Sequence, residues 1–334
     1  MARNIEHFTA TRTEDLPDYW DDLAGDNPFL KRNYLEVLER TNSCNQEYHI
    51  FADHEPDSIV VTYKLDLDIF TYSKVKLKLP VTIVGIPCSV SRCGYKIGKK
   101  TVAKVSEYFT TVGGAALVLN SEDELKINGF ARGTTLPTCK LYIQWNTFEQ
   151  YLKDMRSHYR YRIGKALAKG QEIEMAELAE NDLFDEELYE LYLQVYGKSE
   201  FKLEKLGIEF FRRSSAKIIT FSVRGRAVAF IQLMENDDEL IFLFGGFDYS
   251  QNLKYDLYIN MLLEILRRGI DGGCKTIDMG QTAEDTKMKL GCRSVAKYMY
   301  ARHSNVIINS IVHRGIGFLS YKPKDLNFHV FRGG

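Results

Sequence analysis

The same order of predicted secondary structure occurs twice along the 334-residue chain. In the first half, two helices precede a run of strands, a further helix and more strands, over 14–41, 47–85, 98–112 and 115–145. The second half repeats this order with helices, strands, a long helix and a short strand, at 184–214, 218–247, 255–268 and 275–279. The sequence therefore predicts an α/β (α+β) protein with two copies of one fold. Each copy is expected to be a mixed, mainly antiparallel sheet flanked by helices, over 1–146 and 147–334.

One amphipathic helix is predicted over residues 147–169, between the two copies. Thr147 is a suitable N-cap and Gly170 a suitable residue just beyond the C-terminus. Basic side chains, including Arg160 and Arg162, crowd its polar side. They suit either a solvated helix face, favoured by the helix dipole, or contact with an anionic ligand.

Composition excludes several classes of protein. The net charge is −1, so nothing in the overall charge favours general binding to nucleic acid or to an anionic membrane. No run of about 18 apolar residues and no leader is present, which predicts a cytoplasmic protein without a membrane span. The six scattered cysteines indicate reduced thiols rather than disulfides or a metal centre. Neither a metalloprotease motif nor a nucleophile elbow occurs.

The first candidate site is a strand that runs into a polar loop and then a helix, at residues 244–255. The unpaired N–H groups at a helix start attract a phosphate or carboxylate. An ordinary strand–helix connection is the alternative, since no Walker or Rossmann glycine pattern is present. The candidate ligand-binding residues are Gly246, Ser250, Gln251, Asn252, Lys254 and Tyr255.

The second candidate site is the segment 276–291. A buried strand delivers Asp278 and Gln281 to its C-terminal end, the edge at which open α/β sheets place ligands. Lys287 and Lys289 follow as candidate anion-binding residues. The alternative is that Asp278 only caps a neighbouring element.

Together, these segments resemble the C-terminal half of GNAT-fold acyltransferases. The arrangement is similar to that of the double-GNAT branch, which contains FemAB-like and BioF-like proteins. It consists of a strand, a polar loop and a long helix, followed by Ile277-Asp278-Met279-Gly280 and Lys287-Met288-Lys289-Leu290-Gly291. The helix with Tyr159-Arg160-Tyr161-Arg162 is similar to the basic helix that precedes the second half there. The resemblance covers 147–303, and over 1–146 it extends only to element order.

The resemblance implies N-acyl transfer from a thioester or ester to an amine. Asp278 would act as the base, backbone N–H groups near Phe244–Gly246 would hold the oxyanion, and Tyr298 or Tyr300 would protonate the leaving group. Core packing is the alternative for both tyrosines. The usual pyrophosphate loop, Gln/Arg-x-x-Gly-x-Gly/Ala, is missing.

The implied co-substrate is acyl-CoA or an acyl carrier protein, with no tightly bound cofactor and no metal. The implied acceptor is the amine of a small metabolite or peptide, and the first copy would help to shape its cleft. Charged tRNA is a weaker candidate donor, because no coiled-coil arm is inserted. Two non-catalytic functions remain open: a catalytically inactive module that senses the donor, and an RNA-binding protein that uses the 147–169 helix.

Overall fold

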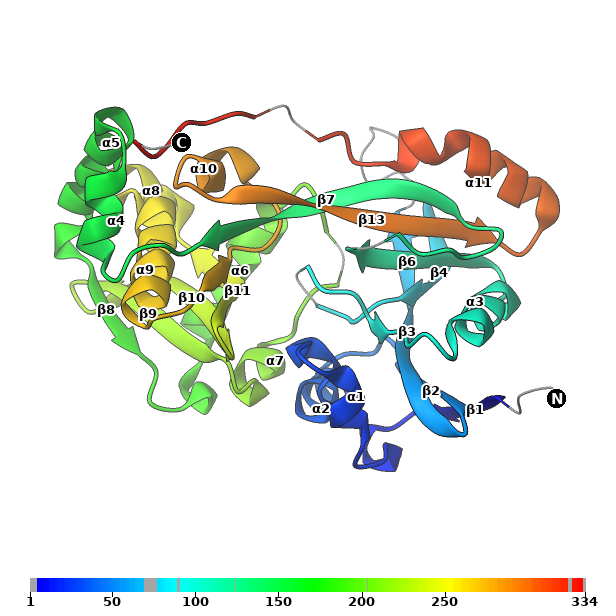
Figure 1. The fold of residues 1–334 in the computed structure, drawn as a ribbon. Helices are drawn as coiled ribbons and strands as arrows, with labels where there is room; N and C mark the ends of the chain where they lie inside the picture. The colour runs from blue at the N-terminus through cyan, green and yellow to red at the C-terminus, as the bar shows by residue number, and fades with distance from the viewer. Residues whose placement is uncertain are drawn as a thin grey trace. The chain divides into compact units, whose positions relative to one another are not determined.

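The computed structural model describes residues 5–68, 77–88, 91–122, 124–202, 204–323 and 326–332, and it divides into two compact units (Figure 1). The first unit comprises Met1–Leu136, Leu203–Leu206 and Ala296–Pro323. The second comprises Pro137–Lys202, Gly207–Val295 and Lys324–Gly334. Each unit is a mixed sheet with helices packed on it, which confirms the predicted fold class.

The first unit has strands in the order β1-β2-β3-β4-β6-β13. Their bounds are β1 Ile5–Ala10, β2 Glu47–Asp53, β3 Glu55–Asp68, β4 Lys78–Val84, β6 Ala115–Ser121 and β13 Arg293–His303, while β5, Tyr95–Lys96, pairs with β3. The helices are α1 Trp20–Ala24, α2 Arg32–Thr41, α3 Val102–Thr111 and α11 Val306–Leu319. All pairs among these strands are antiparallel except β4 with β6, because α3 carries the chain back between them.

The second unit repeats this topology with strands in the order β8-β9-β10-β11-β12-β7. Their bounds are β8 Glu174–Glu177, β9 Lys217–Val223, β10 Arg226–Asn236, β11 Glu239–Phe247, β12 Thr276–Asp278 and β7 Ala131–Tyr142. The helices are α4 Phe148–Asp154, α5 Ser157–Lys169, α6 Glu186–Lys198, α7 Ile208–Arg213, α8 Tyr249–Tyr255, α9 Leu257–Asp271 and α10 Glu284–Met288. Again one pair is parallel, β11 with β12, and α8 and α9 connect its strands.

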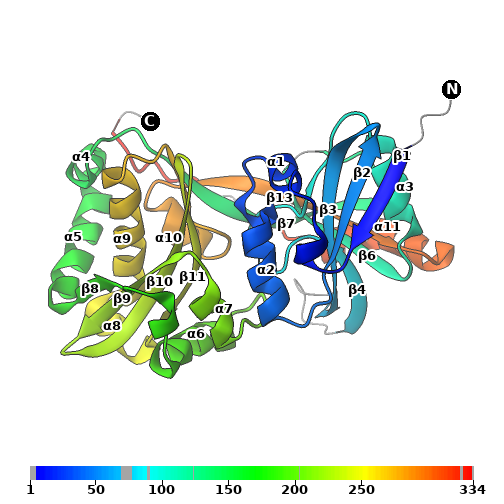
Figure 2. The same cartoon turned by 90° about the horizontal axis from the view of Figure 1, so that it is seen from below.

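Two helical layers enclose the β9–β11 sheet of the second unit. Figure 2 shows α9 on one side of these strands and α6 and α7 on the other. Ten of the 15 residues of α9 are buried, because its apolar side chains pack on Ile219, Ile231 and Leu240 in one core cluster. Aromatic rings from α6, α7 and the strands fill the opposite layer, including Phe211 and Phe230 with ring centroids 5.7 Å apart.

The two halves of the chain exchange their last strands. Residues 140–142 of β7 pair antiparallel with β12 of the second unit, although β7 lies in the first half of the sequence. Conversely, residues 298–303 of β13 pair with β6 of the first unit. The sequence predicted one boundary at 146/147, which would leave β7 in the first copy and β13 in the second. The structure differs because these pairings are non-local, and a local pattern carries no information on the partner of a strand.

The predicted helix over 147–169 is two helices, α4 and α5. Met155 and Arg156 between them are extended, with ψ angles of 145° and 148°. Met155 forms a β-bridge with Phe331, and the Arg156 backbone N–H donates to the Val330 carbonyl at 2.9 Å. The prediction of one helix was wrong because the C-terminal segment takes backbone hydrogen bonds at the break.

Candidate functional site

The central feature of the second unit is a gap beside β11. Only the first three residues of β11, Glu239–Ile241, pair in parallel with β12, opposite Thr276–Asp278. Strand β11 itself continues to Phe247. On the other side of β11, the register with β10 shifts so that Leu243 has no partner, which is a β-bulge. Alternate N–H groups of a strand point to opposite neighbours, so beyond Ile241 some point into the gap. Such fixed donors suit an oxyanion, as predicted for Phe244–Gly246.

Glycines allow both helical layers to approach β11 closely. A Cβ atom on Gly246 would lie 2.4 Å from the backbone N of Tyr192 in α6. A Cβ atom on Gly245 would lie 2.9 Å from Met261 Cε in α9, on the other face. Close packing of α6 therefore accounts for Gly246, which was predicted from sequence as a ligand-binding residue.

Gln232 of β10 is a polar residue that the sequence analysis missed. Its side chain is 0% exposed, and neither its Oε1 nor its Nε2 has a hydrogen-bond partner in the described part of the chain. Gln232 lies directly opposite Phe244 of β11 and two residues from Phe230, so it shares the sheet face covered by α6 and α7. The signal was present, since Gln232 is the one polar residue in the apolar run 227–234.

Asp278 ends β12 and is fully buried. Its Oδ1 accepts from the Thr138 hydroxyl at 2.5 Å and from the Gly280 backbone N–H at 2.9 Å. Its Oδ2 lies 3.8 Å from Lys140 Nζ, which also contacts Glu239 at 2.9 Å. These contacts join the end of β12 to β7, so Asp278 has a clear structural role at the base of the gap.

Lys287 of α10 lies just behind this strand end. It is 2% exposed and donates to the carbonyl oxygens of Gln281 at 2.7 Å and Gly280 at 3.2 Å. Burial lowers the pKa of Lys287, although the neighbouring Cys139, Cys292, Asp278 and Glu284 oppose that shift. Lys287 thus shapes the loop after β12, whereas Lys289 forms a 2.5 Å ion pair with Asp285.

The helix starts after β11 are capped by their own side chains. Asp248 Oδ1 accepts from the Ser250 backbone N–H at 2.8 Å and from the Ser250 hydroxyl at 2.7 Å. Asn252 Oδ1 accepts from the Tyr258 backbone N–H at 3.0 Å at the start of α9. At the start of α8, the Asp248 carboxylate already occupies the N–H group that a phosphate would bind. A phosphate at the predicted site would therefore lie next to a negative charge.

The other predicted residues of this segment have partners nearby. Gln251 Nε2 contacts the Ser250 hydroxyl at 3.5 Å, and Lys254 Nζ lies 4.5 Å from the Tyr255 ring centroid. Tyr255 is buried, and its hydroxyl lies 3.5 Å from Glu172. The segment is therefore well ordered by contacts within the second unit.

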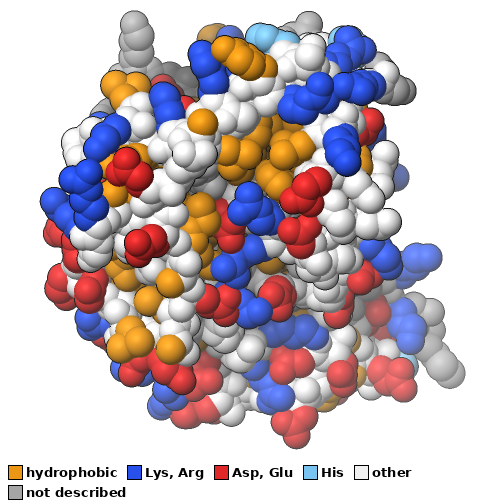
Figure 3. Space-filling view, turned by 90° about the vertical axis from the view of Figure 1, so that its left-hand side faces the viewer, with side chains coloured by type: hydrophobic (Ala, Val, Ile, Leu, Met, Phe, Trp, Pro, Cys, Tyr) orange, Lys and Arg blue, Asp and Glu red, His pale blue; other side chains and the backbone are white. Residues whose placement is uncertain are grey.

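Helix α5 carries the basic residues predicted to contact an anion. Arg160 instead donates to the carbonyls of Lys153 and Met155, each at 3.2 Å, and so stabilises the end of α4. Arg162 and Lys165 are exposed, and neither forms an ion pair with an acidic side chain among the residues that the structure describes. Figure 3, which views the side of α4 and α5, shows basic and acidic side chains interspersed. Within the described part of α5, Arg162 and Lys165 are therefore the cations open to an anion.

Tyr298 and Tyr300 belong to the first unit, whereas the other predicted site residues belong to the second. Tyr300 is buried in the core of the first unit, and its hydroxyl oxygen accepts from the Leu125 backbone N–H at 2.8 Å. The Arg132 guanidinium lies 4.0 Å from the centroid of the Tyr298 ring. Packing and local hydrogen bonding account for both rings.

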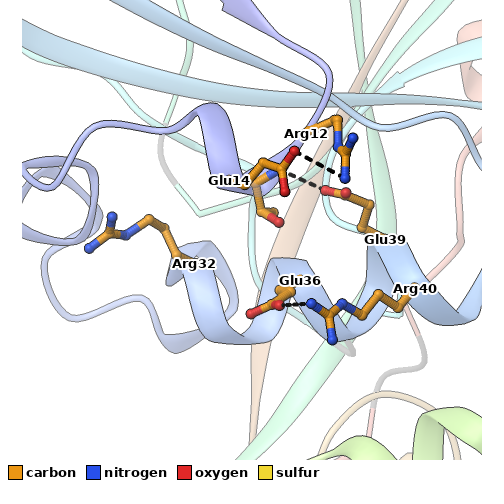
Figure 4. Close-up of a pocket in the computed structure, with 7 residues that line it drawn as sticks. Arg12, Glu14, Arg32, Glu36, Glu39 and Arg40 are labelled. Atoms are coloured by element: carbon orange, nitrogen blue, oxygen red, sulfur yellow. Dashed lines mark hydrogen bonds and ion pairs between the residues drawn. The ribbon is translucent and has the colours of Figure 1, made fainter.

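A polar pocket of 360 Å³ opens in the first unit beside α2 (Figure 4). Arg12 pairs with Glu14 at 3.0 Å and Arg40 with Glu36 at 2.5 Å, while Arg32 turns to Asp18 at 3.1 Å. Its cations are therefore compensated internally. Over the described ranges, no cluster of His, Cys, Asp or Glu side chains is arranged to hold a metal ion. No described helix has both the length and the apolar character to cross a membrane.

The splayed parallel pair, the bulged strand and the helix layer on each face all lie in the second unit, which also holds the residues that match a known family. Residues 153–288 match the family described as the acetyltransferase (GNAT) domain. No curated protein matches the chain.

Solved structures share the fold over nearly the whole chain. L-PGS from Bacillus licheniformis is 12% identical, with a TM-score of 0.53, over 92% of this chain and 98% of that one. FemX is 9% identical, with a TM-score of 0.53, over 92% and 100%. A conserved protein of unknown function from Bacteroides thetaiotaomicron VPI-5482 is 11% identical, with a TM-score of 0.51, over 86% and 98%. Residues 153–288 thus match an acetyltransferase (GNAT) domain, and the likeness to these structures shows the fold of the whole chain.

Proposed function

We propose that the protein transfers an acyl group from a thioester or ester to an amine at the gap beside β11. The gap beside β11 is the observation that carries the proposal, and the unpaired amide of Gln232 lies on the neighbouring strand β10. Backbone N–H groups after Ile241 would stabilise the negative charge on the carbonyl oxygen in the transition state. The Gln232 amide would hydrogen-bond a polar group of the substrate, either as donor or as acceptor.

The proton acceptor remains a proposal. Asp278 is our candidate base, but Asp278 and its hydrogen-bond partner Thr138 are both without exposed surface, so a proton would reach Asp278 only after a substrate displaces the side chains around them. Tyr298 and Tyr300 remain candidates for protonating the leaving group. Their local contacts require that a substrate displace those contacts before either can act.

We further propose that cations of α5 hold the phosphates of the donor. The Asp248 carboxylate occupies the start of α8, where a pyrophosphate would otherwise bind backbone N–H groups. Lys169 at the C-terminal end of α5 contacts the Leu253 carbonyl at 3.0 Å and Asp256 at 3.1 Å, so this helix adjoins the α8–α9 junction. Arg162 and Lys165 precede Lys169 on α5 and are available to phosphates. Acyl-CoA, the phosphopantetheine of a carrier protein and charged tRNA all carry such phosphates.

The test is turnover with acetyl-CoA, an acylated carrier protein and charged tRNA, each offered with a panel of amine acceptors. The doubly substituted Arg162→Glu, Lys165→Glu protein should raise KM for the true donor about tenfold or more at low salt, and the effect should shrink as salt screens charges. Lys99→Glu, an exposed substitution in the first unit, is the control. An unchanged KM would refute the role of α5. Donor binding without turnover, for every acceptor, would favour a catalytically inactive module.

A further inference from the structure

Helix α11 exposes a continuous apolar stripe. Val306, Ile307, Ile311 and Phe318 are 82%, 75%, 63% and 79% exposed. Ile307, Ile311 and Phe318 recur at the spacing of one helix face, which they share with Arg314. Single exposed apolar residues are ordinary in soluble proteins, but several on one face of a helix make that face a candidate interaction surface.

The opposite face of α11 is anchored to the first unit, so the stripe is not an unfilled part of its core. The side chains of Asn309 and His313 both contact the Gly129 carbonyl, at 2.9 and 3.0 Å. Ile316 packs near Gly133 of β7, where a Cβ atom would come within 3.1 Å of it. Figure 1 shows α11 lying alongside β7 and β13. These contacts fix which side of the helix faces outward.

The charge along α11 and along the chain just before and after it is of one sign. No Asp or Glu occurs between Asp285 and Asp325, a stretch that includes the whole helix. Arg314 lies on the stripe itself, and Lys322 is exposed just after the helix. A helix with an apolar face, with cations and with no carboxylate of its own is complementary to a surface that is apolar inside and anionic outside.

A second copy of the chain is a poorer occupant. At 1.5 Å per residue and roughly 10 Å wide, the 14-residue helix offers a footprint of about 200 Å². A stable dimer needs roughly 800 Å² from each partner. Two copies would also bring their Arg314 side chains toward each other across the contact.

We propose that α11 docks the protein on an anionic lipid surface, with Ile307, Ile311 and Phe318 inserted among the acyl chains and Arg314 at the headgroups. The helix lies in the plane of the surface, because it is too short to span a bilayer. The weak overall charge does not oppose this, because the attraction is local and acts within about 10 Å. The acyl-transfer proposal is independent of this surface.

The test is flotation of the full chain with vesicles of phosphatidylglycerol and phosphatidylcholine, beside vesicles of phosphatidylcholine alone. We expect binding to the anionic vesicles to be at least about tenfold stronger. Phe318→Glu should weaken binding to them by about tenfold or more, because a large buried apolar side chain is replaced by a charge facing anionic lipid. Arg314→Glu should weaken it and remove the preference for anionic lipid.

Leu183→Glu is the matched control, because Leu183 is 58% exposed in the second unit and lies far from α11 in sequence. It should bind as the unsubstituted protein does. Equal binding by Phe318→Glu, an absence of binding to either vesicle, or a dimer in light scattering that Phe318→Glu dissociates would each overturn the proposal. Thermal unfolding of every variant shows that the fold is retained, as expected for exposed positions.

Discussion

Replacing Gln232 with leucine should make the protein more stable and less active. Gln232 is fully buried, and both polar atoms of its amide lack partners among the residues described. An unpaired buried polar group costs about 1–3 kcal/mol, and Leu has nearly the volume of Gln without that group. The free energy of unfolding should therefore rise by about 1–3 kcal/mol. The unfolding temperature should rise by roughly 2–4 °C for each kcal/mol.

The matched control is Asn260→Leu. Asn260 is also a buried amide, but its Nδ2 donates to the carbonyls of Tyr255 at 2.8 Å and Ala166 at 2.9 Å. Its replacement strands those carbonyls and should lower stability by a similar amount. Thermal and urea unfolding of both variants measure the two signs. If Gln232→Leu is instead destabilising, the amide has a partner and the reasoning fails.

Activity measurements show whether the Gln232 amide binds the substrate or only destabilises the fold. If Gln232 bonds the substrate, Gln232→Leu should lower kcat/KM by about tenfold, and Gln232→Glu or Gln232→Asn should restore part of it. A stabilised variant with unchanged kcat/KM for the identified donor and acceptor would remove Gln232 from the site. The gap beside β11 would then have to act through its backbone alone.

Three further predictions concern the scaffold. Asp278→Asn keeps an oxygen that can accept from Thr138 and Gly280, but it removes the charge beside Lys140 and puts an amide NH2 group there, so thermal unfolding should show a loss of about 1–3 kcal/mol. A retained kcat in that variant would rule out Asp278 as the base. Gly246→Ala should lower the free energy of unfolding by about 1–3 kcal/mol, because the new Cβ atom would force α6 away. Gly197→Ala should not lower it in the same urea titration, because a Cβ atom at Gly197 would meet no neighbouring atom within 4 Å. Burial, reinforced by His7, lowers the pKa of His49 from 6.5 to about 3. The unfolded chain therefore binds the proton first, and stability should fall by about 1.4 kcal/mol per pH unit from pH 6.5 toward 3. Urea unfolding at pH 7 and pH 5 should show this slope, and His49→Gln should lose it.

Local pattern was sufficient for the elements but not for their partners. Thr147 caps a helix as predicted, accepting from the Gln150 backbone N–H at 3.2 Å, because a cap depends on residues within one turn. The break at Met155 depends on Phe331, far along the chain, and periodicity carries no trace of it. The exchange of β7 and β13 escaped prediction for the same reason. Helix α11 was missed because its apolar residues face outward, and no buried face sets its pattern.

Of the site residues, the backbone features were easier to predict than the side chains. A strand that ends in glycines before a helix indicated the position of the gap, since strand, loop and helix are local. The roles of Ser250 and Lys254 depended on what else the helix start would bind, and Asp248, which lies only two residues before Ser250, takes that place. The sequence shows that Asp248 precedes the helix, but not that its carboxylate accepts a hydrogen bond from the Ser250 backbone N–H of that helix.

Strand β11 is where this fold departs most from what stability alone would select. It has a bulge at Leu243, two glycines, and a parallel ladder that stops after Ile241. Glycines destabilise a strand because they have no side chain to pack and because the unfolded chain gains more entropy. The unpaired amide of Gln232 lies on the strand beside it. Each feature lowers stability alone, and sequences usually satisfy such local rules except where function requires otherwise. Their coincidence on two adjacent strands is the physical argument for a functional site there, and this argument does not depend on the likeness to any other protein.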